Sequence, residues 1–220
     1  MIDYEKARRH LRRSDPVMAG LIRRVGACRL GDHAAFDPFA SLTRSIASQQ
    51  LSIKAADTIF GRFCDLFPGR LPVPAALLAL DDAPLRAAGF SRPKISFLRD
   101  LAARVDDGRL DLVALRTLPD EEALARLVEV KGIGRWTAEV FLMFRLERPD
   151  LFPVDDVGLV RAVRLAYGLR GQPKPARLLR LAEPWRPYRT VASWYLWQSL
   201  PYLDAQPRSA ARQPAARPRG

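Results

Sequence analysis

The spacing of apolar residues constrains the fold of this chain more than any other feature. Leu, Ala and Arg recur at helical intervals, whereas alternating β-branched residues are scarce. Phe39, Leu42 and Ile46 share one helical face, and Asp37-Pro38 before them is a typical helix start. The pattern predicts an all-α protein without a strand pair or internal repeat. Helices are expected at 39–46, 53–67, 74–80, 93–107, 120–129, 135–146, 157–168, 175–183 and 188–201.

Composition excludes several classes of protein. No run approaches about 18 apolar residues, so no transmembrane helix is expected. The N-terminus lacks the pattern of a secretion signal, so we expect a cytoplasmic protein. Two cysteines, Cys28 and Cys64, cannot form a disulfide framework or supply a four-cysteine iron–sulfur cluster. Two histidines, His10 and His33, leave little for a histidine-based catalytic or metal site.

The charge of the chain suggests a polyanionic partner. The 220 residues carry 36 Lys and Arg against 24 Asp and Glu, a net charge of +12, and nucleic acid is the first candidate. The abundance of Arg beside Ala, Leu and Pro could equally reflect codon composition. Residues 205–220 hold four of the Arg and no acid, and their composition predicts a disordered basic tail. Charge alone therefore leaves nucleic-acid binding open.

One segment joins two predicted helices by a tight turn, Lys131-Gly132-Ile133-Gly134. An apolar stripe precedes the turn, and Trp136, Val140 and Phe144 repeat every four residues after it. The glycines permit positive φ and close approach to the backbone, and Ile133 is expected to plug between the helices. Two interpretations stay open: a capping turn in an α bundle, or a helix–hairpin–helix that grips a DNA phosphate through its amides. The second predicts phosphate contacts at Lys131, Gly132, Ile133, Gly134, Arg135 and Thr137.

Two adjacent carboxylates follow the second helix of this hairpin. A Pro-containing loop leads to Asp155-Asp156, with an apolar helical stripe directly after it. Acidic residues at a helix start commonly cap the helix, and an isolated Asp-Asp pair would be explained by capping alone. One of the two suffices as a cap, which leaves the other to point elsewhere.

Four segments together resemble a known family. Lys-Gly-Ile-Gly-Arg-Trp-Thr-Ala at 131–138 is followed about twenty residues later by Phe-Pro-Val-Asp-Asp-Val-Gly at 152–158. Ser-Ile-Ala-Ser-Gln-Gln-Leu-Ser at 45–52 and the Trp-rich segment at 185–197 complete the set in family order. Over roughly residues 35–203, the chain resembles the helix–hairpin–helix DNA glycosylase superfamily, in its 3-methyladenine DNA glycosylase II branch.

The resemblance implies roles for individual residues. Asp156 is the catalytic carboxylate and Asp155 a cap or helper, although comparison with the endonuclease branch would favour Asp155. The implied base pocket is aromatic: Trp136, Trp197, Trp194 and Tyr195. The implied DNA wedge is Gln50, with its neighbours Leu51 and Gln49. In relatives, hairpin carbonyls often hold a monovalent cation, and the matching positions here are Val128, Val130 and Ile133.

Two positions bear on the subtype. Bifunctional relatives place a Lys directly after Gly-x-Gly-Arg to form a Schiff base with the sugar, and this chain has Trp136 there. Val140 stands where well-known members carry a further aromatic residue, which leaves the width of the substrate range open.

The resemblance thus implies a monofunctional glycosylase of base excision repair. It would flip an alkylated purine, of the 3-methyladenine or 7-methylguanine type, out of double-stranded DNA and hydrolyse its N-glycosidic bond. We expect a monomer without membrane association and without a catalytic cofactor. The implied fold has two helical subdomains with the active cleft between them: 37–148 with the hairpin, and 1–36 with 149–204. The alternatives are a bifunctional glycosylase/lyase and a non-catalytic DNA-binding module.

Overall fold

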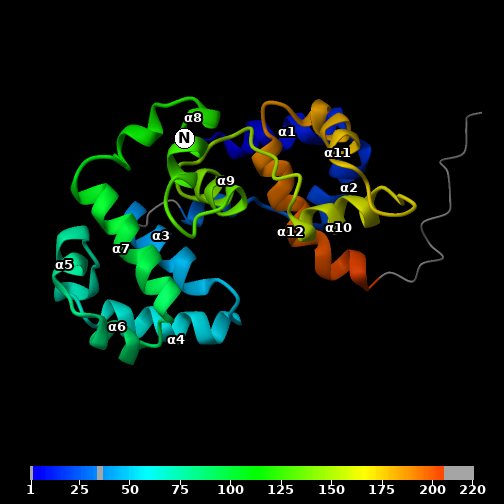
Figure 1. Ribbon diagram of the computed structural model, residues 1–220. Coiled ribbons are helices and arrows are strands. Elements are labelled where there is room, and N and C mark those ends of the chain that lie inside the picture. Colours follow the sequence, from blue (N-terminus) through cyan, green and yellow to red (C-terminus); the bar gives the residue numbers. More distant parts are fainter. Residues whose placement is uncertain (1, 34–36, 206–220) are drawn as a thin grey trace, which may run out of the picture. The chain divides into compact units, whose positions relative to one another are not determined.

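The computed structural model describes residues 2–33 and 37–205, and over these ranges the chain is helical without strands. This confirms the predicted all-α class. The chain divides into two compact units, which we call unit 1 (residues 1–31 and 147–220) and unit 2 (residues 32–146) (Figure 1). The sequence predicts the same division, with its boundaries at residues 37 and 149 in place of 32 and 147. Of the predicted basic tail, 205–220, residues 206–220 lie outside the ranges that the structure describes. In the described ranges no helix combines the length and the apolar character needed to cross a membrane.

Unit 1 is built around its last helix, α12 (Arg189–Asp204), which packs on α10, α2 and α1. Residues from both ends of the chain supply the unit's core, including Leu11, Ile22 and Leu196, which are fully or almost fully buried. The remaining helices of unit 1 are α1 (Tyr4–Ser14), α2 (Pro16–Val25), α10 (Val157–Ala166) and α11 (Pro175–Ala182), with a short 3-10 turn at Glu183–Trp185. A further 3-10 turn, Leu30–His33, spans the boundary between the two units.

Unit 2 carries the hairpin. Its first helix, α3 (Pro38–Ser48), packs on α4, α7 and α9, while α5 lies on α7 and α8 pairs with α9. The other helices of this unit are α4 (Ile53–Cys64), α5 (Pro74–Ala79), α6 (Asp82–Ala88), α7 (Arg92–Asp106), α8 (Asp120–Val128) and α9 (Arg135–Phe144), with 3-10 turns at Pro68–Arg70 and Ala114–Arg116.

The start signals in the sequence form real helix caps. The Asp37 carboxylate accepts a hydrogen bond from the Ala40 amide at 2.8 Å, and Pro38 occupies the first turn, as the Asp37-Pro38 pair predicts. Three helices had no counterpart in the prediction: α1, α2 and α6. In α1 the buried residues are Ala7 and Leu11, among many charged side chains. Charged and apolar residues nevertheless lie on different faces of α1, so the sequence itself carries the periodic signal of this helix.

A buried carboxylate connects separate parts of unit 1. Asp15 caps α2, and its Oδ1 accepts hydrogen bonds from the amides of Val17 (2.8 Å) and Met18 (3.1 Å). Its Oδ2 accepts from the Tyr167 hydroxyl, at the end of α10, and from the Trp185 indole at 2.9 Å. Burial and the adjacent Asp15 raise the pKa of Tyr167, so its hydroxyl stays a donor. Four donors from three segments therefore converge on one side chain.

This network predicts an unequal cost for removing two helix caps. We expect Asp15→Ala to lower the free energy of unfolding by about 3 kcal/mol or more, because it strands buried donors on Tyr167 and Trp185 besides removing a cap. Asp3→Ala removes an exposed cap of α1 and should cost about 1 kcal/mol. Urea unfolding of both variants measures the difference. Equal losses would show that the buried network adds nothing to capping.

Candidate functional site

The predicted hairpin is present in unit 2. Helix α8 ends at Val128 and α9 begins at Arg135, with a short turn between them. Val130 and Ile133 are 1% and 3% exposed, and the Ile133 amide donates to the Val130 carbonyl at 3.0 Å. The expected plugging role of Ile133 is therefore confirmed, and the turn is anchored in the core of the unit.

The two glycines of the turn have different roles. Gly132 has φ +82°, and a Cβ atom there would lie 2.2 Å from the ring of Phe97. Both its backbone conformation and its surroundings therefore require glycine. Gly134 caps α9 with an ordinary φ of −85°, and a Cβ atom there would meet nothing within 4 Å. The space beside Gly134, at the amino end of α9, is thus open to a molecule from outside.

Two groups beside the hairpin, the Lys131 backbone amide and the Arg135 guanidinium, are already engaged within the protein. The Lys131 amide donates to Asp100 Oδ2 at 2.9 Å. The Arg135 guanidinium pairs with Glu121 at 3.1 Å and with Glu139 at 3.0 Å. The hydrogen bonds that Arg135 donates to Glu121, together with the nearby carboxylate charges, raise the pKa of Arg135. Two carboxylates therefore offset the charge of Arg135, which was predicted from the sequence to contact a phosphate.

The turn after α3, the predicted wedge, is tied to the hairpin. Gln49 Nε2 donates to the Gly132 carbonyl at 2.7 Å, so Gln49 supports the turn from within. Lys94 Nζ donates to the carbonyls of Ala47 and Gln49, both at 2.7 Å, and burial lowers its pKa. Sequence reasoning missed Lys94, because its acceptors are backbone carbonyls more than forty positions away. Nothing near Lys94 in the chain signals that contact.

The outer residues of the same turn face solvent. Gln50 is exposed and has a positive φ of 59°, which is uncommon outside glycine. Leu51 is 39% exposed, a large apolar side chain left in water. A pocket of about 390 Å³ in unit 2 is lined by Gln49 and Gln50 together with Trp136 and Thr137. Trp136 is half exposed, so the structure places one predicted pocket residue beside the predicted wedge.

Asp156 lies at the start of α10 in unit 1 and is itself the cap of that helix. Its Oδ1 accepts a hydrogen bond from the Leu159 amide and one from the Trp197 indole at 2.8 Å. Asp155 is exposed and does not cap α10. Of the two roles expected for Asp155, cap or helper, the cap is therefore wrong: Asp156 caps the helix and also contacts Trp197.

Gly158 makes room for this contact. A Cβ atom at Gly158 would lie 3.2 Å from Asp156 Oδ1 and 3.6 Å from the Trp197 indole nitrogen. Such a spacing is tighter than ordinary van der Waals contact to the carboxylate, so a larger residue would push the carboxylate or the ring aside. The glycine two positions after Asp156 thus belongs to the geometry of the carboxylate.

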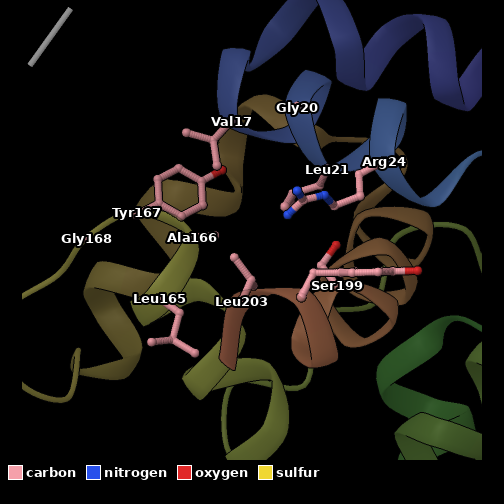
Figure 2. Close-up of a pocket in the computed structure, with 11 residues that line it drawn as sticks. Val17, Gly20, Leu21, Arg24, Leu165, Ala166, Tyr167, Gly168, Ser199 and Leu203 are labelled. Atoms are coloured by element: carbon pink, nitrogen blue, oxygen red, sulfur yellow. The ribbon is translucent and has the colours of Figure 1, made fainter. Parts of the chain in front are cut away.

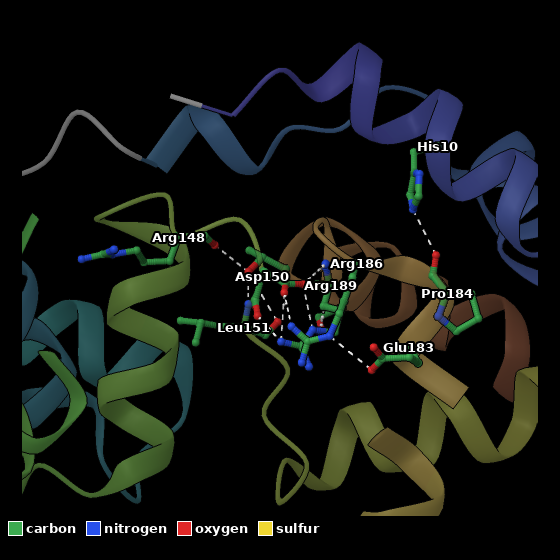
Figure 3. Close-up of polar contacts among 10 residues, drawn as sticks. His10, Arg148, Asp150, Leu151, Glu183, Pro184, Arg186 and Arg189 are labelled. Atoms are coloured by element: carbon green, nitrogen blue, oxygen red, sulfur yellow. Dashed lines mark hydrogen bonds and ion pairs between the residues drawn. The ribbon is translucent and has the colours of Figure 1, made fainter. Parts of the chain in front are cut away.

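The loop that leads to Asp156 is clamped to the start of α12 (Figure 3). The Asp150 carboxylate accepts from Arg189 at 2.8 Å and from Arg186 at 2.7 Å, and the Asp150 carbonyl accepts from Arg189 at 2.7 Å. The buried Thr190 hydroxyl donates to the Arg148 carbonyl at 2.6 Å and accepts from the Leu151 amide at 3.0 Å. Sequence reasoning missed this clamp, because its partners are nearly forty residues apart.

Two predicted pocket aromatics belong to the core of unit 1. Trp194 and Tyr195 are 6% and 0% exposed and pack edge to face, 5.0 Å apart. The Tyr195 hydroxyl donates to the Gly26 carbonyl at 2.9 Å. Rings that are buried to this extent offer no face to a ligand, and the Tyr195 hydroxyl already has its partner. Trp194 and Tyr195 are therefore corrected from pocket residues to core residues. Trp197, one turn further along, is partly exposed and contacts Asp156.

A larger pocket in unit 1 is not part of this site. It has a volume of about 580 Å³ and lies between α2, the end of α10 and the end of α12 (Figure 2). Its lining includes Leu21, Arg24, Tyr167 and Leu203, and none of the residues predicted for the site. Arg24 lies over the ring of Tyr202, 5.4 Å from its centre.

Known proteins are similar to this chain in sequence and in fold. DNA-3-methyladenine glycosylase 1 of Schizosaccharomyces pombe is 36% identical over 202 residues, which cover 90% of this chain and 89% of that protein. A solved DNA-3-methyladenine glycosidase from Bacillus halodurans is 39% identical, with a TM-score of 0.81 and 91% of each chain covered. The S. pombe 3-methyladenine DNA glycosylase in complex with abasic DNA is 36% identical, with a TM-score of 0.78, covering 88% of this chain and 96% of that one.

The family model described as HhH-GPD superfamily base excision DNA repair protein matches residues 43–187. This range includes the turn after α3, the hairpin and the Asp156 loop. The matched segments are thus the ones whose geometry is described above. The chain belongs to the HhH-GPD superfamily of base excision DNA repair proteins.

Proposed function

We propose that this protein is a monofunctional DNA glycosylase of base excision repair that removes alkylated purines from double-stranded DNA. The observation that carries the proposal is Asp156, a partly exposed carboxylate whose Oδ1 is held by the Leu159 amide and the Trp197 indole. A group aimed by two hydrogen bonds is already in position when a substrate arrives. The similarity to 3-methyladenine glycosylases supports the substrate class.

The reaction suits a single fixed carboxylate. When the bond between C1′ and the base nitrogen breaks, its electron pair leaves with the base and positive charge develops on the sugar. The Asp156 carboxylate stabilises that charge electrostatically. Water then adds to C1′ and gives up a proton, which the carboxylate accepts. The products are the free base and an abasic site.

The proposed substrate needs little help from an acid. A purine alkylated at N3 or N7 is already cationic, so it leaves as a neutral base without being protonated. Electron-rich rings attract such a cation at their faces. Trp136 and Trp197 are the partly exposed aromatics of the predicted set, and we propose them as the base-binding rings. Trp194 and Tyr195 are left out because they are buried.

DNA binding is proposed to use the hairpin backbone and the neighbouring turn. The amino end of α9 offers amides to a phosphate, and Gly134 leaves the approach open. Thr137 lines the adjoining pocket. Gln50 and Leu51 are exposed residues of the turn after α3. We therefore propose that they enter the base stack when the damaged base is flipped out.

We also propose that no iron–sulfur cluster takes part, because the chain has two cysteines. A monovalent cation fits the hairpin chemically, since the candidate ligands are backbone carbonyls of one turn. Of these, the Val130 carbonyl already accepts the Ile133 amide and has a second lone pair. The carbonyls of Val128, Val130 and Ile133 would hold the ion, which would neutralise phosphate charge. A monomer in the cytoplasm completes the proposal.

Loss of the Asp156 charge should abolish most activity. Asparagine is nearly as good a helix cap as aspartate, so Asp156→Asn should fold normally and release bases from methylated duplex DNA about 10²–10³-fold more slowly. The matched control, Asp155→Asn, should stay within about threefold of the wild type, because Asp155 is exposed and holds no helix. Equal release by wild type and Asp156→Asn would rule out the catalytic role. No release by any form would point to a DNA-binding module.

The absence of a Lys at position 136 predicts cleavage of the glycosidic bond alone. We expect duplex DNA to stay intact after base release until it is heated in alkali, because Trp136 cannot form a Schiff base with the sugar. Gel analysis with and without alkali tests this, with borohydride trapping as a second readout. Strand nicking without alkali, or a trapped covalent complex, would establish a lyase.

The two glycines of the hairpin should respond differently to alanine. Gly132→Ala forces a Cβ atom into Phe97 at positive φ, so we expect a loss of about 2 kcal/mol or more in unfolding free energy. Gly134→Ala meets no atom of the protein and should leave stability within about 0.5 kcal/mol of wild type. Its DNA affinity should nevertheless fall about tenfold, because the methyl group occupies the phosphate approach. Unchanged affinity in Gly134→Ala would argue against the amide site.

A further inference from the structure

A second cationic site lies in unit 1, on the helices α1 and α2. A pocket of about 310 Å³ is lined by one small residue, Ala19, and by four arginines: Arg9, Arg12, Arg13 and Arg23. Three of them come from α1 at positions i, i+3 and i+4, which share one helix face. The fourth comes from α2, one turn after Ala19. We call this pocket the arginine cleft.

These four guanidinium groups have no acidic partner. Within residues 2–33 and 37–205 none of them makes an ion pair or a side-chain hydrogen bond. Other arginines of unit 1 differ: Arg8 pairs with Glu5, and Arg189 pairs with Asp150. The cleft is therefore a concentration of uncompensated positive charge.

The acids nearest to the cleft in the chain are already occupied. Asp3 caps α1, and Glu5 pairs with Arg8. Asp15, between the two helices, is buried and accepts four hydrogen bonds. None of them is left to neutralise the cleft. Four like charges around one cavity repel one another, and an anion bound among them removes that repulsion.

The chemistry of the lining favours phosphate. Each guanidinium presents a planar fork of donors that matches phosphate oxygens in pairs. The only other lining residue is Ala19, which is too small to obstruct an anion and offers no apolar surface for a hydrophobic ligand. Arginines on two helices can also follow successive phosphates of one strand.

We infer that the arginine cleft binds the phosphate backbone of DNA, as a contact on unit 1 additional to the hairpin of unit 2. The inference rests on the proposed function, which brings DNA to this chain as its substrate. Duplex DNA carries a dense and regular array of phosphate charges, which suits a cluster of four guanidinium groups. The contact reads no base, so it serves binding to undamaged DNA during the search for a lesion.

Binding to undamaged DNA tests the cleft without requiring catalysis. The cleft variant carries Arg9→Gln, Arg12→Gln, Arg13→Gln and Arg23→Gln. A control variant removes four equally exposed charges elsewhere on unit 1: Arg170→Gln, Lys174→Gln, Arg177→Gln and Arg180→Gln. Dissociation constants for an undamaged duplex are measured over a range of salt concentrations, and thermal unfolding confirms that both variants fold.

We expect the slope of log affinity against log salt concentration to become shallower by about one to two units in the cleft variant. Each lost phosphate contact lowers the magnitude of that slope by about 0.9, so this change corresponds to one or two contacts. That corresponds to a loss of about tenfold or more in affinity near 0.1 M salt. The control variant should change by less than half as much. A second variant with Lys at the four positions should keep the slope, because slope follows charge, and lose affinity, because the donor fork is gone.

Three results would overturn the inference. The first is an equal salt slope in the wild type and the cleft variant, and the second is an equal loss of DNA affinity in the cleft and control variants. The third is a cleft variant that loses affinity for polyglutamate but not for DNA. The last result would identify an acidic protein as the ligand. A wild type that binds DNA through the cleft but releases no base would reject the proposed function and leave this inference standing.

Discussion

Asp156 Oδ1 accepts hydrogen bonds from two helices at once, from the Leu159 amide of α10 and from the Trp197 indole of α12. The position of the proposed catalytic carboxylate therefore depends on how these two helices pack. Asp150 ties the preceding loop to Arg186 and Arg189 at the start of α12. The far end of α10 is held by Tyr167, whose hydroxyl donates to the buried Asp15. Unit 1 thus acts as a scaffold that aims one oxygen atom.

Unit 2 fixes backbone groups in the same way. Gln49 joins the turn after α3 to the hairpin turn through the Gly132 carbonyl, and Lys94 holds the end of α3. Phe97 fills the space that any side chain at Gly132 would need. Because these contacts hold both turns in place, little conformational entropy would be lost if, as proposed, their amides bind a phosphate. The proposed binding would then need few charged side chains at the hairpin itself.

The charge of the protein is distributed accordingly. The charge of Arg135, at the hairpin, is offset by Glu121 and Glu139. The charge of Arg189 is offset by its ion pair with Asp150. Four arginines of α1 and α2 without acidic partners gather instead around one cleft. A net charge of +12 is therefore a poor guide to where an anion binds. The location follows from which arginines have acidic partners.

The sequence by itself determined the helical class, the starts of helices such as α3 with its Asp37 cap, the hairpin with its buried Ile133, and the family. These are local properties: apolar spacing, capping residues and glycines act within a few positions of one another. Only the tertiary structure decided that Asp156 is the cap of α10, that Tyr195 is core, that Gln49 supports the hairpin and that Arg135 is neutralised. Each of these depends on a partner from another element, such as Trp197, Gly26, Gly132 or Glu121. Which side chains meet across a core is set by packing of whole helices, and no local pattern records it.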